Sequence, residues 1–452
     1  MRRRRRAGAS RASAGLPRRT FLTGLTGAAA TAGVAAAAGL AGILGARRAP
    51  AAAQRTVELR FYDWKLTDKP PRKALELIAA EFTKKYPNIR VKLEEVSWPD
   101  HQKKLVVLAQ GGNPPDVARI TDAGVLPLAD IGAIVPLTEW AVKNKADDFL
   151  IKIPASVRKG LQFKGADYMA CATASMDILT WNTALFKEAD LDPEKPPKTW
   201  DALAESARKL TDPKKDQYGW GIMSERSNSA SRRVIAWILS GGGELFNEQG
   251  TELVANSEAG LKGFQFWAEL ALKYKACPPG SANAAFRDVM RGYGQGKIAM
   301  FDGGPNNPKM AEVDYPGILE RTNMGPMPDP WRCPLRATGF VVMNGSKFKE
   351  EALLLTSWMT SVYGQVEYGL ESYEVPIRSD AAADPKLKRE RLLVESAAQA
   401  KRGVANPALH VKYAEIEQKL FDAMQATLAG SKTAKQALDE FVAEGNKILK
   451  RG

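Results

Sequence analysis

Aromatic and polar side chains directly follow three predicted strands in the first third of the chain. They are Asp63, Trp64, Trp98, Thr121 and Asp122. In an open α/β sheet, the ligand crevice lies beyond the carboxyl ends of the strands. An indole ring offers an apolar face, while a carboxylate or a hydroxyl offers hydrogen bonds. These residue types therefore predict a site for a small ligand that has both hydroxyl groups and apolar C–H faces.

Alternating and amphipathic segments place these residues at strand ends. Strands are expected at 57–62, 89–96 and 116–120, and helices are expected between Pro70 and Pro87 and over 100–110. This strand–helix–strand order is typical of parallel βαβ units in an α/β fold. Further along, the same reasoning predicts helices at 200–210, 232–240, 258–274, 411–428 and 432–449 and strands at 297–301 and 339–343.

The composition argues against several functional classes. The net charge of +14 comes mostly from ten arginines in residues 1–53, and the remaining chain has 55 basic against 51 acidic residues. That balance gives no reason to expect a nucleic-acid partner. With only two histidines, no CxxC pair and no catalytic or cofactor motif, we expect neither an enzyme nor a bound metal or cofactor. A disulfide between Cys277 and Cys333 is left open.

The first 53 residues read as an export leader. Arg18-Arg19 is followed by Thr20-Phe21-Leu22, which resembles the twin-arginine export signal, and an Ala- and Gly-rich stretch leads to Ala51-Ala52-Ala53. Cleavage is expected before Gln54. The leader contains no cysteine, so a lipoprotein anchor is not expected. An uncleaved N-terminal anchor helix is the alternative.

Six segments in collinear order resemble the extracellular solute-binding proteins of family 1, the maltose-binding-like group that serves ABC importers. The resemblance runs from about Val57 to Leu449. The segments that carry it are Glu81–Ile89 (EFTKKYPNI), Gly111–Val117 (GGNPPDV), Trp181–Lys187 (WNTALFK), Lys198–Asp201 (KTWD), Gly241–Phe246 (GGGELF) and Gly296–Phe301 (GKIAMF).

The resemblance implies a two-lobed periplasmic binding protein fold of the type II-like kind, in which hinge crossovers join two α/β lobes around a ligand cleft. One lobe is expected at 54–170 plus 303–348 and the other, richer in helix, at 171–302 plus 349–452. It further implies a monomeric, non-enzymatic receptor in the periplasm that captures a carbohydrate by hinge closure and delivers it to the membrane permease of an ABC transporter.

The resemblance also adds site residues near the expected hinge and cleft. They are Ser175, Asp177, Trp220, Asp302, Gly303, Asn306, Trp331, Arg336, Tyr373 and Arg378. Two positions depart from the family pattern: Asn306 stands where many members have a ligand-contacting Trp, and the passage at Cys171 lacks the usual Pro. The ligand class therefore stays open between a carbohydrate and a glycerol-phosphate ester, polyol or organic anion, and an exported enzyme is a third alternative.

Overall fold

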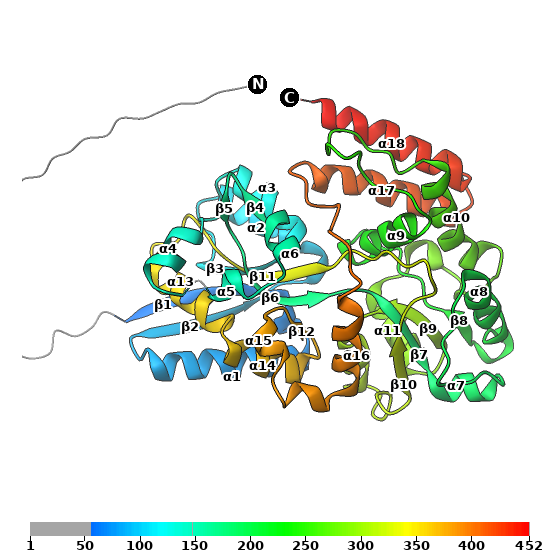
Figure 1. The fold of residues 1–452 in the computed structure, drawn as a ribbon, viewed down its shortest axis with the longest axis horizontal. Helices are drawn as coiled ribbons and strands as arrows, with labels where there is room; N and C mark the ends of the chain where they lie inside the picture. The colour runs from blue at the N-terminus through cyan, green and yellow to red at the C-terminus, as the bar shows by residue number, and fades with distance from the viewer. Residues whose placement is uncertain (1–55, 147, 452) are drawn as a thin grey trace, which may run out of the picture. The chain divides into compact units, whose positions relative to one another are not determined.

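The protein's structure, a computed structural model, describes residues 56–146 and 148–451. The predicted leader, residues 1–53, lies outside the described residues. The described chain forms two main β-sheets, with helices packed against them (Figure 1). Within 56–146 and 148–451, no helix is long and apolar enough to cross a membrane.

The first sheet has six strands in the order β12-β6-β11-β3-β1-β2. Its strands are β1 (Val57–Asp63), β2 (Ile89–Glu95), β3 (Val117–Thr121), β6 (Ala170–Ser175), β11 (Arg336–Val342) and β12 (Val375–Pro376). β1 pairs in parallel with both β2 and β3, which confirms the predicted βαβ order. β11 is antiparallel to β3 and β6, and β12 is antiparallel to β6.

The second sheet has four strands in the order β10-β7-β9-β8. They are β7 (Ile178–Asn182), β8 (Tyr218–Trp220), β9 (Ile298–Gly303) and β10 (Thr322–Gly325). β8 and β9 are parallel, whereas β7 is antiparallel to both β9 and β10. A small hairpin of β4 (Gln162–Phe163) and β5 (Ala166–Asp167) stands apart from both sheets.

Helices connect and cover these strands. Before β7 they are α1 (Lys69–Lys85), α2 (His101–Gln110), α3 (Val125–Asp130), α4 (Thr138–Lys143), α5 (Asp148–Ile151) and α6 (Ala155–Gly160). From β7 to β10 they are α7 (Thr183–Glu188), α8 (Trp200–Lys209), α9 (Asn228–Ser240), α10 (Glu258–Leu272), α11 (Phe286–Gly294) and α12 (Asn306–Glu312). After β11 they are α13 (Lys349–Met359), α14 (Val362–Ser372), α15 (Ser379–Ala382), α16 (Arg391–Ala400), α17 (Tyr413–Leu428) and α18 (Ala434–Lys450).

The chain passes between the two sheets three times. The first passage consists of residues 176–177, which connect β6 of the first sheet to β7 of the second. Figure 1 shows these two strands one after the other along the chain. The second is the segment 326–335 between β10 and β11, and the third leads from α15 to α17. We call these three connecting segments (residues 176–177, residues 326–335 and the chain between α15 and α17) the crossovers.

The observed sheets divide the chain at other points than the predicted boundaries of 303–348 and 349–452. α12 and β10 stay with the four-stranded sheet, because β10 pairs with β7. α13 and α14 belong with the six-stranded sheet, because their Leu353 and Tyr368 are buried in one cluster with Phe340 of β11. α13 and α14, which lie within the predicted second lobe, thus pack on the six-stranded sheet.

Helices α9 and α10 pack with their backbones in close approach. A Cβ on Gly263 would lie 1.9 Å from the backbone oxygen of Trp237, which is far inside van der Waals contact. The glycine is therefore required by the distance between the two helices. Trp237 itself is fully buried in the core of the four-stranded sheet.

We expect Gly263→Ala to lower the free energy of unfolding by about 2 kcal/mol, because the added methyl group meets backbone atoms that cannot rotate away. Urea denaturation checks this. The matched control is Lys262→Ala, an exposed change on the same helix that should stay within about 0.5 kcal/mol. Equal stability of the two variants would contradict the packing described.

His101 is buried beside two indole rings on the six-stranded sheet. Its ring centroid lies 4.3 Å from that of Trp64 and 4.7 Å from that of Trp98. Its Nδ1 lies 2.6 Å from the backbone oxygen of Trp98. Burial lowers the pKa of His101 to about 4. The folded protein therefore strongly favours the neutral imidazole.

This lowered pKa predicts acid sensitivity. Above pH 6.5 His101 is neutral in both states, but between pH 6.5 and 4 the unfolded chain takes up a proton that the folded chain refuses, so stability falls by about 3 kcal/mol. Unfolding of the wild type and of His101→Phe at pH 7.5 and 4.5 measures this loss. The variant should lose about 3 kcal/mol less than the wild type. An equal loss in both proteins would show that His101 does not carry the effect.

Candidate functional site

A row of hydrogen-bonded side chains crosses the six-stranded sheet near the end of β1. Arg119 Nε donates to Asp63 Oδ2 at 2.7 Å, and Arg119 Nη1 reaches Thr338 Oγ1 at 3.5 Å. Thr173 Oγ1 lies 2.8 Å from Thr338 Oγ1 and donates to Glu374 Oε2 at 3.0 Å. Asp63 and Arg119 are fully buried. The predicted ligand contact Asp63 is thus bound by Arg119, and its carboxylate joins β1 to β3.

The two tryptophans predicted for the site differ in accessibility. Trp64 is buried, in the short 3-10 helix that follows β1. Trp98 is half-buried, and its ring centroid lies 5.0 Å from that of Trp64. Trp64 is therefore packed away from solvent, whereas the ring of Trp98 is partly accessible, and contact of either ring with a ligand stays a prediction.

Asp122, at the end of β3, connects the six-stranded sheet to the last crossover. Its carboxylate accepts hydrogen bonds from the backbone N–H of Ala123 at 2.9 Å, from that of Ala337 at 3.1 Å and from Asn406 Nδ2 at 3.0 Å. Burial raises the pKa of Asp122. The neighbouring Thr121 is also buried. The described chain thus engages Asp122 from two segments far apart in the sequence.

A group of charged side chains gathers around Asp177 in the first crossover. Arg232 of α9 binds its carboxylate through two bonds of 3.0 Å, and Arg233 Nη2 lies 3.3 Å and Arg336 Nη2 3.7 Å away. Burial alone would raise the pKa of Asp177, but the three guanidinium groups hold it below its ordinary value. Together with Asp302, these residues form what we call the crossover cluster.

Asp302 joins this cluster from the end of β9. Its Oδ1 accepts a hydrogen bond of 3.0 Å from Arg233 Nε. Burial raises the pKa of Asp302 to about 6. The next residue, Gly303, has no room for a side chain, because a Cβ there would lie 2.2 Å from Asn307 Oδ1. Asn306, the first residue of α12, is half-buried just beyond.

Of the two remaining predicted tryptophans, Trp331 lies at the cluster and Trp220 does not. Trp331 Nε1 donates to the backbone oxygen of Asp177 at 2.9 Å, so the second crossover is tied to the first. Trp220 lies in the core of the four-stranded sheet with 1% of its surface exposed, packed against Trp237. Trp220 thus lies apart from the crossover cluster, and its contact with a ligand stays a prediction.

The last three predicted residues surround the crossovers at different points. Ser175 ends β6 opposite Arg336 of β11. Tyr373 follows α14, donates its hydroxyl hydrogen to Glu390 and has the ammonium of Lys309 4.4 Å from its ring centroid.

Arg378 does not join the cluster. Its guanidinium binds Asp380 at 2.8 Å and lies 3.5 Å from Asp148 of α5. Arg378 is 5% exposed, and its charge is balanced by these two carboxylates. Its contact with a ligand stays a prediction.

Sequence reasoning missed Arg232, Arg233 and Asn406. The sequence contains a usable signal for the first two, because the residues of α9 from Val234 onward are apolar or small. The structure shows Arg233 to be 1% exposed. A charged residue in such a helix must have a partner. Nothing in the pattern around Asn406 distinguished it from an ordinary loop residue.

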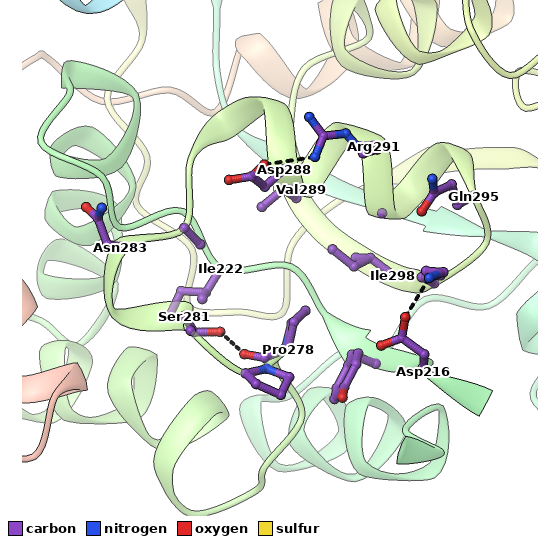
Figure 2. A pocket seen from close by; sticks show the side chains of 16 residues that line it. Asp216, Ile222, Pro278, Ser281, Asn283, Asp288, Val289, Arg291, Gln295 and Ile298 are labelled. Carbon is purple, nitrogen blue, oxygen red and sulfur yellow. Dashed lines mark hydrogen bonds and ion pairs between the residues drawn. The ribbon is translucent and has the colours of Figure 1, made fainter. Parts of the chain in front are cut away.

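A separate hollow of about 290 Å³ lies at the amino ends of β8 and β9 in the four-stranded sheet (Figure 2). It is lined by Tyr218 and Ile298, the first residues of β8 and β9, so it faces the amino ends of these parallel strands. Its charges are paired among themselves: Lys297 lies 2.5 Å from Asp216, and Arg291 lies 3.3 Å from Asp288. Since ligands in open α/β sheets lie beyond the carboxyl ends, we do not take this hollow as the main site.

No group of three or more His, Cys, Asp or Glu side chains that could hold a metal ion occurs in the described part of the chain. Its three cysteines, including Cys277 and Cys333, are free and buried, so they are not joined by a disulfide in this structure. Burial raises the pKa of Cys333 to about 12.

Comparison with known proteins supplies relatives by sequence. The chain is 26% identical over 284 residues to a probable amino-acid ABC transporter periplasmic-binding protein of Sinorhizobium fredii, covering 61% of this chain and 62% of the relative. It is 22% identical over 330 residues to a maltotriose-binding protein of Pyrococcus abyssi, covering 70% and 66%. The chain thus spans a little less than two thirds of these curated relatives.

A solved structure gives a longer match. An ABC transporter solute-binding protein of Thermotoga lettingae, bound with α-D-tagatose, has a TM-score of 0.80 and 25% identity. The match covers 87% of this chain and all of the other. The two sheets and their crossovers therefore form the α/β periplasmic binding protein fold. Residues 67–366 match the family model of the bacterial extracellular solute-binding protein, and the chain belongs to that family.

Proposed function

We propose that this protein is the extracytoplasmic binding subunit of an ABC importer. It captures a carbohydrate, a mono- or oligosaccharide, between the two sheet-bearing halves of the chain and delivers it to the permease in the membrane. Capture proceeds by hinge closure about the crossovers, which buries the ligand and brings both halves together. The protein acts as a receptor, without catalysis and without a cofactor.

The observation that carries this proposal is the convergence of polar side chains from both sheets at the crossovers. Arg336 comes from the six-stranded sheet, Arg232 comes from a helix of the four-stranded half, and Asp177 lies between them. A site built from both halves at the segments that connect them changes its geometry when the halves rotate. The half-buried ring of Trp98 adds an apolar face of the kind that sugar C–H groups stack on.

The relatives support the carbohydrate as the first ligand class. The Thermotoga lettingae structure holds a sugar, and the Pyrococcus abyssi relative is a maltotriose-binding protein. A second ligand class is a glycerol-phosphate ester, polyol or organic anion, and the observation that favours its anionic members is the gathering of three guanidinium groups in the crossover cluster.

We further propose that the protein works in the periplasm as a monomer. Its leader would direct export through the twin-arginine pathway, and cleavage before Gln54 would release it without a lipid anchor. The small-molecule ligand and the ABC permease are then its partners. The twin-arginine leader allows the chain to fold before it crosses the membrane.

The ligand proposal is tested by thermal unfolding of the chain from Gln54 with a panel of sugars, polyols and glycerol-phosphate esters. A true ligand at a hundred times its dissociation constant should stabilise the protein by about 2.7 kcal/mol. A panel in which no small solute raises the melting temperature would contradict the receptor function. Hydrolysis of an oligosaccharide by the purified protein would instead indicate an enzyme.

The export proposal is tested by changing Arg18 and Arg19 together to lysine in the full-length chain. The precursor should then accumulate in the cytoplasm, because the arginine pair is the feature that the pathway reads. Fractionation and blotting measure the distribution. Changing Arg5 and Arg6 to lysine is the matched control and should leave export intact. Unchanged export of the first variant would overturn the twin-arginine assignment.

A further inference from the structure

Arg336 is nearly buried, yet its guanidinium makes no hydrogen bond to any described residue. Its side chain is 12% exposed, and its Nε is buried without a partner. Among the described residues, its one oppositely charged neighbour within 4 Å is Asp177, whose Oδ2 lies 3.7 Å from Nη2, too far for a hydrogen bond. A guanidinium carries five N–H donors, and leaving them unpaired away from water is costly. The described chain thus provides no hydrogen-bond acceptor for the N–H groups of Arg336.

The carboxylates around Arg336 are already engaged by other groups. Asp177 receives both of its strong bonds from Arg232. Asp302 is bound by Arg233, and Asp122 accepts hydrogen bonds from two backbone N–H groups and from an amide side chain. None of these acids accepts a hydrogen bond from Arg336, and Asp177 approaches it only to 3.7 Å. A missing partner must therefore come from outside the described chain.

Arg232 offers a second set of free donors beside the first. Its Nε and Nη2 bind Asp177, which leaves its Nη1 without a hydrogen-bond partner among the described residues. Arg232 Nε and Arg336 Nη2 both approach the same atom, Asp177 Oδ2, at 3.0 and 3.7 Å. Two guanidinium groups held this close repel each other unless negative charge lies between them. Asp177 lies between them, but its single negative charge faces three guanidinium groups, those of Arg232, Arg233 and Arg336. Burial, and then the like charges of Arg233 and Arg336, lower the pKa of Arg232.

We propose that Arg336 and Arg232 bind an oxyanion of the ligand, so that the solute captured at the crossovers is an acidic sugar or an acidic polyol. This inference rests on the proposed receptor function and narrows its ligand. A carboxylate, as in a uronic acid, and a phosphate ester, as in a sugar phosphate or a glycerol phosphate, present the same paired oxygens to a guanidinium fork. The oxygens would accept the free N–H groups, and the hydroxyl groups of the ligand would meet the remaining polar side chains.

A purely structural role for Arg336 is the rival explanation. An arginine that pinned the crossovers together would be expected to hold Asp177 or a backbone oxygen by hydrogen bonds, as Arg232 and Arg233 do. Arg233 Nη1, for example, donates to the backbone oxygen of Ser229 at 2.7 Å. Arg336 has no bond of this kind. Replacing Arg336 should therefore change the free energy of unfolding of the ligand-free protein little. Replacing an arginine that joined the crossovers would lower it strongly.

The experiment compares acids with their neutral counterparts on the chain from Gln54. Titration calorimetry and thermal unfolding are run with glucuronate against glucose, galacturonate against galactose, glucose 6-phosphate against glucose, and glycerol 3-phosphate against glycerol. At least one acid should bind at least about tenfold more tightly than its neutral partner, and added NaCl should weaken its binding. The uronates and the phosphate esters distinguish the two sources of the oxyanion.

Arg336→Gln should weaken the acid at least about tenfold while leaving the melting temperature without ligand unchanged or raised. Arg291→Gln is the matched control, since Arg291 is an exposed arginine that pairs with Asp288 on α11 outside the crossovers, and the variant should bind the acid as the wild type does. If Arg336→Gln fails to fold, Arg336 acts as a pin and the inference is wrong. Arg336→Lys, which keeps the charge without the planar fork, should lose part of the affinity.

The outcomes separate the inference from the proposed function. Binding of a neutral sugar with no preference for its acid overturns the inference and leaves the receptor function intact. Unchanged affinity for the acid in Arg336→Gln also overturns the inference. If none of the solutes binds, both fail together.

Discussion

The structure depends on a buried carboxylate at the point where the chain crosses from one sheet to the other. Asp177 is 1% exposed and lies between β6 of the six-stranded sheet and β7 of the four-stranded sheet. A charge in that position is stable only if it is paired and hydrogen-bonded. Arg232 supplies two bonds from the four-stranded half, and the indole of Trp331 holds the backbone of the same residue. The first two crossovers are thereby joined at one residue.

This constraint explains why the surrounding elements are arranged as they are. α9 must present consecutive arginines, one toward Asp177 and one toward Asp302, and its close packing on α10 through Gly263 sets its position. On the other side, the ion pair of Asp63 with Arg119 joins β1 to β3 inside the six-stranded sheet. The two halves are thus each held by their own buried charges, and polar groups from both converge where the chain crosses.

Much of the fold could be predicted from local patterns. Alternation over 57–62 and the apolar face between Pro70 and Pro87 correspond to β1 and α1, because hydrophobic periodicity reflects which face of an element is buried. The placement of α13 and α14 could not be predicted, because an amphipathic helix packs equally well on either sheet. Only long-range packing decides, here the burial of Tyr368 in one cluster with Phe340 of β11. Local pattern contains no information about that choice.

The candidate site was predictable only in part. Asp177, Asp302, Trp331 and Arg336 do come together, although they are distant in the sequence. Trp220 and Arg378 lie apart from the cluster, which the sequence could not show, because an indole in a strand or an arginine in a loop looks the same whether it faces a ligand, a core or an acid on another element. The partner of Arg232 could not be identified from the sequence, because Asp177 lies 55 positions away along the chain.

We propose that the ligand binds against Arg336 and Arg232 at the crossovers. A crystal structure of the chain from Gln54 grown with its tightest-binding solute tests this most directly. We expect an oxyanion of the ligand within hydrogen-bond distance of the Arg336 guanidinium, with residues of both halves around it. A ligand bound in the hollow at the amino ends of β8 and β9 instead, with Arg336 still unpaired, would contradict it.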